Sequence, residues 1–284
     1  MQPYDLMSID LIPMHTAPFS ERKGCPIVGI IVHSMGSGFL ESLNTLTGEV
    51  SAHYFVPQLT GRELQQQYPG FFAHVEIQYP DRVPVIQLVP TDQCAWHAGV
   101  STFSNWNTLP GCETGLNACT IGIEFHTPGY GEGRNWYCFS TLTPQQTETG
   151  IALVQMLQQH YQIPSTHFLA HSTIAVGRKT DPGPLFPWQA FSEAGIGPRG
   201  AVSSPSLAEA DGVLAVQHRL RQLGFVACPL TGVWDAATVA HLDAFVLQFA
   251  GHAWRGPAQH DTPEVLACLH EIDFNNPLIG LYER

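Results

Sequence analysis

The stretch Ile27–His33 reads IVGIIVH, a run of apolar and mostly β-branched residues that ends in a histidine. Two later runs have the same form: IGI at 121–123 leads into Glu124, and FLA at 168–170 leads into His171. Short continuous apolar runs are typical of strands buried on both faces of a sheet that helices cover. Adjacent strands of this kind would bring their reactive side chains together at one rim of the sheet.

A helix is predicted between the second and third of these runs. Thr143 is a suitable N-cap, Pro144 fits the first helical position, and Gln146 completes a capping box. Apolar residues recur at helical spacing over Ile151–Tyr161, and Pro164 ends the pattern. Strands interleaved with helices predict an α/β domain with a central mixed β-sheet flanked by helices.

The composition changes after Trp188, where glycine, proline and serine gather in a stretch typical of a linker. Two segments with apolar residues at helical spacing follow, and a third helix is expected over Pro263–Ile272. The first segment carries Val213, Val216, Leu220 and Leu223, and the second carries Val239, Leu242, Phe245, Val246 and Phe249. We predict an α/β domain at 1–195, a linker at 196–206 and a small all-α three-helix domain at 207–284.

The charge balance excludes one class of partner. The 284 residues include 12 basic and 24 acidic side chains, which leave a formal net charge of -12. A surface of this sign repels phosphate backbones, so nucleic acid is not expected as a partner. Met1–Met14 lacks the cationic start and apolar core of a signal peptide. No stretch approaches the roughly 20 apolar residues that span a bilayer, so no transmembrane segment is expected.

Seven cysteines are present, and none forms a Cys-x-x-Cys pair. A thiolate zinc ribbon or a thioredoxin-type redox site therefore has no support. Cys112 and Cys119 lie in one loop and are candidates for a disulfide in an oxidising compartment. Small buried thiols are an equally good interpretation, and both remain open.

His33 and His171 stand out among the fourteen histidines because each ends or follows a buried run. Asp181 follows ten positions after His171. Two imidazoles and one carboxylate form the kind of three-ligand shell that catalytic zinc uses, with the fourth position left for water. Zinc lowers the pKa of such a water to about 7. The residue types and positions of these three side chains therefore lead to the hypothesis that they bind Zn²⁺.

Five motifs carry a resemblance to a known family. In chain order they are IIVHS (30–34), SAHYFV (51–56), AWHAG (95–99), IGIEFHTPG (121–129) and LAHSTIAVGRKTDPGPLFPW (169–188). Together they resemble the type 2 N-acetylmuramoyl-L-alanine amidases, which are related to the peptidoglycan recognition proteins. The C-terminal segment AVQHRLRQLGF…TGVWDAATVAHLDAF resembles a peptidoglycan-binding helical domain, but Thr231-Gly232 stands where Asp-Gly is usual.

The resemblance implies a role for five residues. His33, His171 and Asp181 match the zinc ligands of the family. Glu124 matches the catalytic glutamate, which takes a proton from the attacking water and returns it to the leaving amine. Lys179 matches the residue that stabilises the oxyanion.

The AWHAG motif is expected to line the substrate groove, with Trp96, His97 and Ala98 as substrate-binding residues. A packing role for Trp96 and His97 is an equally good alternative to substrate binding. His53 is expected to form hydrogen bonds in the core, and His126 is interpreted as a bystander on the same strand face as Glu124.

The resemblance implies a zinc hydrolase that cuts the amide between the lactyl group of N-acetylmuramic acid, or its 1,6-anhydro form, and L-alanine. Its partner would be peptidoglycan or muropeptides, and it would act as a monomer. A non-catalytic murein-recognition protein is the main alternative, and a zinc peptidase is a third. The periplasm or cell envelope is the expected location, with the cytoplasm as the alternative.

Overall fold

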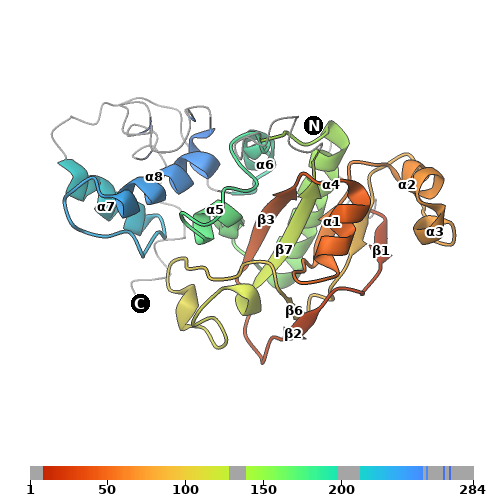
Figure 1. Ribbon diagram of the computed structural model, residues 1–284, viewed down its shortest axis with the longest axis horizontal. Coiled ribbons are helices and arrows are strands. Elements are labelled where there is room, and N and C mark those ends of the chain that lie inside the picture. Colours follow the sequence, from red (N-terminus) through yellow and green to blue (C-terminus); the bar gives the residue numbers. More distant parts are fainter. Residues whose placement is uncertain are drawn as a thin grey trace.

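A six-stranded mixed sheet forms the centre of the computed structural model, which describes residues 9–127, 139–197 and 212–251 and the single positions 254, 265 and 269 (Figure 1). Its strands lie in the order β1 (Leu11–Pro13), β5 (Val85–Gln87), β4 (Tyr54–Val56), β7 (Thr120–His126), β3 (Gly29–Met35) and β8 (Phe168–Ala170). Only β4 and β5 pair antiparallel; the other neighbours are parallel. The predicted mixed sheet is confirmed. A separate antiparallel ribbon joins β2 (Phe19–Glu21) and β6 (Gln93–Ala95).

The three apolar runs form the adjacent strands β7, β3 and β8, as predicted. His33 of β3 pairs with Glu124 of β7, and Val32 pairs with Ala170, the residue before His171. Because all three strands are parallel, their carboxyl ends meet at one rim of the sheet.

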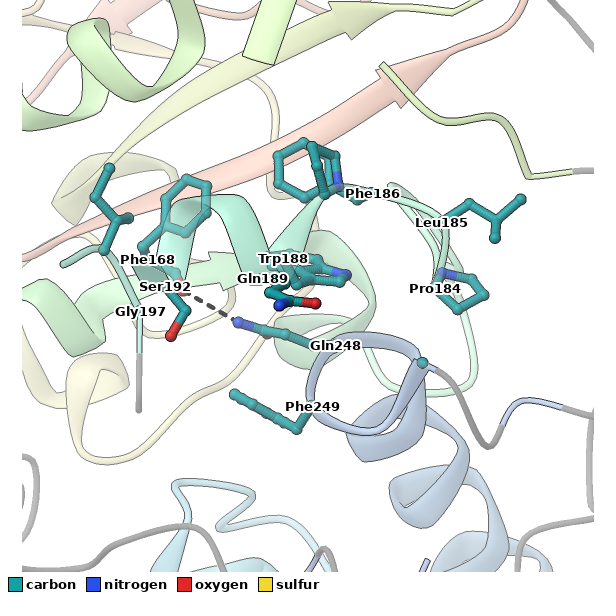
Figure 2. A pocket seen from close by; sticks show the side chains of 13 residues that line it. Phe168, Pro184, Leu185, Phe186, Trp188, Gln189, Ser192, Gly197, Gln248 and Phe249 are labelled. Atoms are coloured by element: carbon teal, nitrogen blue, oxygen red, sulfur yellow. Dashed lines mark hydrogen bonds between the residues drawn. The ribbon is translucent and has the colours of Figure 1, made fainter. Parts of the chain in front are cut away.

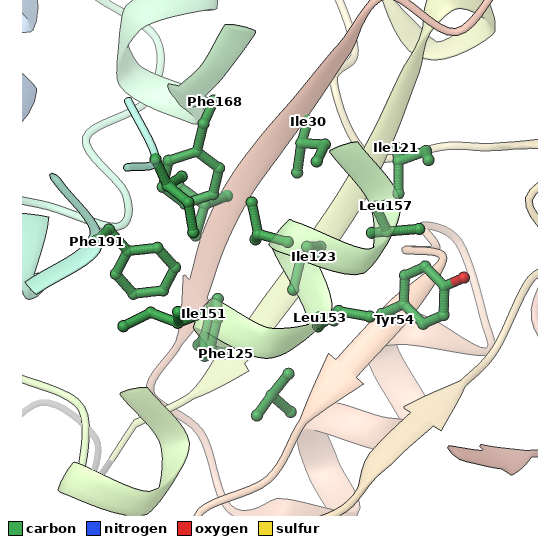
Figure 3. Close-up of a cluster of buried hydrophobic side chains, with 14 of the residues drawn as sticks. Ile30, Tyr54, Ile121, Ile123, Phe125, Ile151, Leu153, Leu157, Phe168 and Phe191 are labelled. Atoms are coloured by element: carbon green, nitrogen blue, oxygen red, sulfur yellow. The ribbon is translucent and has the colours of Figure 1, made fainter. Parts of the chain in front are cut away.

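Helices cover both faces of the sheet. In Figure 1, α1 (Phe39–Leu46) lies in front of the sheet and α4 (Pro144–Tyr161) behind it. Thr143 caps α4 and forms the predicted capping box with Gln146. The core between α4 and the sheet combines helix residues such as Leu153 and Leu157 with the strand residues Ile121, Ile123 and Phe125 (Figure 3). Successive side chains of a strand point to opposite faces of the sheet. Gly122, Glu124 and His126 therefore lie on the face of β7 opposite to this core.

The remaining helices up to residue 197 are short. They are α2 (Gly61–Gln67), α3 (Pro69–Phe72), α5 (His171–Ile174) and α6 (Trp188–Glu193), with single 3-10 turns at Trp106–Thr108, Asn117–Cys119 and Ser165–His167. No helix in the described ranges is long and apolar enough to cross a membrane.

Two C-terminal helices, α7 (Gly212–Gln222) and α8 (Ala236–Phe249), follow the predicted helical patterns. They share one buried cluster with Val265 and Leu269, the only described residues of the third predicted helix, Pro263–Ile272. The rest of that range lies outside the described residues, as does most of the 196–206 linker, so the domain division stays a prediction.

Helix α8 is fastened to the edge strand β8 by the side-chain amide of Gln248. Its Oε1 accepts hydrogen bonds from the Ala170 N–H (2.9 Å) and the Thr173 hydroxyl (2.5 Å). Its Nε2 donates to the Phe168 carbonyl (3.1 Å; Figure 2). The amide thus occupies the backbone groups that a further strand would use. Helix α8 therefore packs against β8 and α5, the helix that begins at His171.

Candidate metal centre

His33, His171 and Asp181 meet at the rim where β3 and β8 end. The Nδ1 atoms of the two histidines are 2.9 Å apart. Asp181 Oδ2 lies 3.3 Å from His33 Nδ1 and 3.1 Å from His171 Nδ1. The Ser172 N–H donates to the Asp181 carbonyl (3.0 Å), which ties the aspartate to α5. Two of these donors, His33 and His171, lie 138 positions apart in the sequence, yet all three form one compact set.

The spacing of these three atoms fits a small tetrahedral cation. Zinc bonds of 2.0–2.1 Å place neighbouring ligand atoms of a tetrahedron about 3.3–3.4 Å apart. The three observed separations of 2.9–3.3 Å lie at or slightly below that value. Two nitrogens and one carboxylate oxygen are also the donors that zinc accepts in catalytic sites. Among the described residues, this is the one group of three or more His, Cys, Asp or Glu side chains with such closeness.

Both histidines are oriented by a second contact at Nε2. His33 Nε2 lies 3.1 Å from His97 Nδ1, and His171 Nε2 lies 3.3 Å from the Ala98 carbonyl. Such outer contacts fix the ring orientation of metal-binding histidines.

The electrostatics of the cluster favour a neutral His33 and an ionised Asp181. Burial, and then the neighbouring His171, lower the pKa of His33 to about 4. Burial alone would raise the pKa of Asp181, but the charge and hydrogen bond of His171 and those of His33 hold it well below its usual range. A neutral imidazole and a carboxylate are the forms that bind a cation.

Glu124 lies beside this cluster, one strand away. It is 7% exposed, and it faces the same side of the sheet as its register partner His33. Burial, and then the negative charge of Asp181, raise the pKa of Glu124 well above its usual value. The nearby Lys179 ammonium acts in the opposite direction, and the Lys179 residue itself is solvent-exposed. A carboxyl that can hold a proton here suits proton transfer.

The three predicted substrate-binding residues have separate surroundings. His97 is buried beside His33, and Ala98 is fully buried with its carbonyl bound by His171 and by the Arg178 guanidinium (2.6 Å). Trp96 is 40% exposed, and its indole N–H donates to Ser20 on β2 (3.3 Å). Substrate contact by these residues stays a prediction, but Trp96 alone of the three presents its side chain to solvent.

One buried arginine, Arg22, was not singled out from the sequence, and it connects several segments of the backbone. The Arg22 guanidinium is 6% exposed and donates to four backbone carbonyls, those of Thr91, Asn117, Ala118 and Thr120. His53 lies beside it and forms core hydrogen bonds, as expected: its Nδ1 accepts from the Gly122 N–H (3.0 Å). No feature of the sequence around Arg22 indicated this role, because its partners are backbone groups of distant segments.

The His126 ring lies away from the metal-ligand cluster of His33, His171 and Asp181: its Nε2 is 2.8 Å from the Ser37 carbonyl, and it packs against Phe39 and Phe55. Cys112 and Cys119 are free, buried thiols in this structure, and Cys112 Sγ lies 3.9 Å from Cys25 Sγ. The interpretation of these cysteines as small core residues fits that arrangement.

A pocket of about 470 Å³ lies away from the metal-ligand cluster, where α6 and α8 meet beside β8 (Figure 2). Aromatic, proline and aliphatic side chains line it, and the aromatic ones are Phe168, Phe186, Trp188 and Phe249. None of the predicted site residues lines it.

Comparison with known proteins shows which family the segment that carries this rim resembles. A family model described as N-acetylmuramoyl-L-alanine amidase matches residues 23–184. The chain is 34% identical over 169 residues to the N-acetylmuramoyl-L-alanine amidase AmiD of Escherichia coli, covering 59% of this chain and 53% of AmiD. It is 37% identical over 173 residues to the 1,6-anhydro-N-acetylmuramyl-L-alanine amidase AmpD of Enterobacter cloacae, covering 57% of this chain and 77% of AmpD.

Two solved structures resemble the fold over most of the chain. One is E. coli AmiD in complex with the substrate anhydro-N-acetylmuramic acid-L-Ala-D-γ-Glu-L-Lys, with a TM-score of 0.65, 25% identity and 89% of each chain covered. The other is AMPDH3 of Pseudomonas aeruginosa in complex with an anhydromuramic pentapeptide, with a TM-score of 0.66 and 27% identity. That match covers 90% of this chain and 93% of AMPDH3, so the likeness extends beyond residue 184.

Proposed function

The chain belongs to the N-acetylmuramoyl-L-alanine amidase family, and from that membership we propose that it hydrolyses the amide between the lactyl carbonyl of N-acetylmuramic acid and L-alanine. The alignment spans only about half the length of AmiD, so the activity is argued from this chain's own site. The observation that carries the proposal is the convergence of His33, His171 and Asp181 beside Glu124 at one rim of the sheet.

We propose that Zn²⁺ is held by His33 Nδ1, His171 Nδ1 and an Asp181 carboxylate oxygen. The donor types and their separations support zinc. When bound, such an ion supplies Lewis acidity, which polarises a carbonyl and makes water a better nucleophile.

Glu124 is proposed as the group that moves the proton. Its carboxylate accepts a proton from the attacking water, and the hydroxide joins the lactyl carbonyl carbon. As the carbon–nitrogen bond breaks, Glu124 returns that proton to the alanine nitrogen, which leaves as an amine. The raised pKa of Glu124 supports this role, since the carboxyl holds the transferred proton readily.

Lys179 is proposed to stabilise the negative charge that develops on the carbonyl oxygen. It lies two residues before Asp181 and is near enough to Glu124 and His33 to affect the pKa of both. Its exposure leaves the ammonium accessible to a bound substrate.

The products of digestion test the proposal. Purified sacculi and a 1,6-anhydro-muropeptide are incubated with the full chain and zinc, and the products are analysed by mass spectrometry. We expect free stem peptides with an L-alanine amine terminus and sugars with a free lactyl carboxylate. Cuts within the peptide would instead identify a zinc peptidase, and the absence of any product would identify a recognition protein.

The anhydro form is included because both similar structures hold an anhydromuramic ligand. The periplasm or cell envelope is proposed as the location, because intact murein lies there. Cell fractionation tests this, and recovery in the cytoplasm would favour anhydro-muropeptides as the substrate.

A further inference from the structure

We propose that His97 and Thr120 are positioning residues that fix the protonation pattern of His33, so that its Nδ1 offers a lone pair to the metal. The inference rests on the proposed function for the identity of the metal. It replaces the substrate contact expected of the His97 side chain with a role behind the metal ligand.

The residues form one continuous chain of hydrogen-bonding atoms. His33 Nε2 lies 3.1 Å from His97 Nδ1, and His97 Nε2 lies 3.2 Å from Thr120 Oγ1. The Thr120 hydroxyl lies 2.6 Å from the Leu116 carbonyl oxygen, which is the last atom of this series of hydrogen bonds.

The direction of this chain follows from its last member. A carbonyl oxygen only accepts, so Thr120 must donate its single proton to Leu116. The Thr120 oxygen then accepts from His97 Nε2–H. A neutral His97 therefore has a bare Nδ1, which accepts from His33 Nε2–H. His33 Nδ1 is left without a proton, facing His171 and Asp181.

Packing holds the middle of the chain in place. The His97 ring lies edge-on to His33, with ring centroids 5.2 Å apart and planes at 86°. It fills the space above Gly122, where an added Cβ would lie only 2.4 Å from the imidazole. The Asn117 side-chain oxygen accepts from the His97 and Ala98 N–H groups (3.0 and 2.6 Å), which fixes the backbone of the motif.

Substitutions of Thr120 can distinguish this hydrogen-bonding role from a packing role. The threonine is fully buried, and valine has nearly its shape without the hydroxyl. Thr120→Val keeps the packing and removes the acceptor that gives the chain its direction, whereas Thr120→Ser keeps the hydroxyl. Thr166→Val is a matched control, because the Thr166 hydroxyl is equally buried and has no hydrogen-bond partner among the described residues.

The experiment measures zinc affinity by competition with a chromophoric chelator for wild type, His97→Phe and the three threonine variants. Loss of an outer hydrogen-bond partner weakens metal binding about 10–100-fold, so we expect this range for His97→Phe and about tenfold for Thr120→Val. Thr120→Ser and Thr166→Val should stay within about threefold of wild type, less than any such loss.

A second readout does not depend on zinc or on catalysis. NMR of the metal-free, ¹⁵N-histidine-labelled chain reports which nitrogen of His33 carries the proton. We expect Nε2–H in wild type and Thr120→Ser, and a mixture in Thr120→Val.

A wild-type His33 protonated on Nδ1, or a Thr120→Val variant with wild-type zinc affinity, would overturn the inference. If His97→Phe fails to fold, the Thr120→Val and Thr120→Ser pair still decides. A wild-type chain that binds no zinc would refute the proposed function, while the NMR measurement would still test the protonation pattern.

Discussion

His33 and Glu124 are register partners in the adjacent parallel strands β3 and β7. Residues opposite each other in a parallel pair point to the same face, so the sheet itself sets a metal-ligand candidate beside a proton-transfer candidate. This pairing divides the rim into two roles that substitutions can separate: binding of the metal and movement of the proton.

Substitution of His171 by alanine should remove the bound zinc. One of only three donors is lost, so the affinity should fall by more than the about 10–100-fold that an outer partner costs. Zinc content is measured by mass spectrometry of the purified protein. His160→Ala, which alters an exposed histidine at the end of α4, should keep wild-type zinc; a similar loss there would contradict the site assignment.

Glu124→Gln should retain zinc and lose activity. A positioned acid–base group contributes about 10²–10⁴-fold to a rate, and the amide cannot accept the proton. The measurement is kcat on the muropeptide, together with zinc content. Unchanged turnover would show that another group moves the proton.

The stability of the metal-free chain should depend on pH through Glu124. Burial, then Asp181, raise the pKa of Glu124, so the folded state keeps a proton that the unfolded chain releases above about pH 4.3. Its stabilising contribution is therefore present at low pH and falls as the pH rises.

Glu124→Gln should consequently raise Tm at pH 7 by a few degrees and change it little at pH 4, since 1 kcal/mol corresponds to about 2–4 °C for a chain of this size. Thermal melts in the presence of chelator check this. Exposed Glu148→Gln is the control, and an equal effect at both pH values would refute the assignment.

Arg22→Lys should destabilise the fold strongly. The ammonium cannot reproduce donation to four carbonyls, and each buried group left unpaired costs about 1–3 kcal/mol. We expect a loss of about 3 kcal/mol in urea denaturation. The same change at Arg62, which forms an exposed pair with Asp81, should change the stability far less, because solvent screens that pair. Equal losses would mean that the Arg22 contacts do not matter.

Gln248→Ala should loosen the C-terminal helices from the sheet. The Phe168 carbonyl and the Ala170 N–H lose their partner, at about 1–3 kcal/mol for each group left buried. Hydrogen exchange at Ala170 and urea denaturation measure the effect. Gln189→Ala removes an exposed amide that donates a hydrogen bond to Glu193 in its own helix, and it should be nearly neutral.

The three strands that carry the site could be predicted from the sequence, because short continuous apolar runs are typical of strands that are buried on both faces of a sheet. Helix α4 could also be predicted from its cap, since Thr143 and Gln146 act locally. The short strands β1, β2, β4, β5 and β6 were not predicted. Each has only three residues, too few to show a period.

The metal-ligand candidates were found from the sequence through motifs, but their supporting partners were not. For His97, a substrate contact and a packing role stayed open, because the sequence does not show that the absent side chain of Gly122 leaves room for its ring. Arg22 acts through backbone carbonyls of distant segments, and Thr120 links the Leu116 carbonyl to the ring of the distant His97. The type of a residue does not show which backbone group or ring its side chain will bond in the folded protein.

The Gln248 amide has a consequence for how the protein behaves at high concentration. An edge strand with free N–H and C=O groups is a template on which another chain can add a strand, and this is a common route to aggregation. Strand β8 lies at such an edge, yet its Phe168 carbonyl and Ala170 N–H are already bonded by one side chain from α8. A single glutamine therefore closes the sheet against self-association at the strand that leads to the metal.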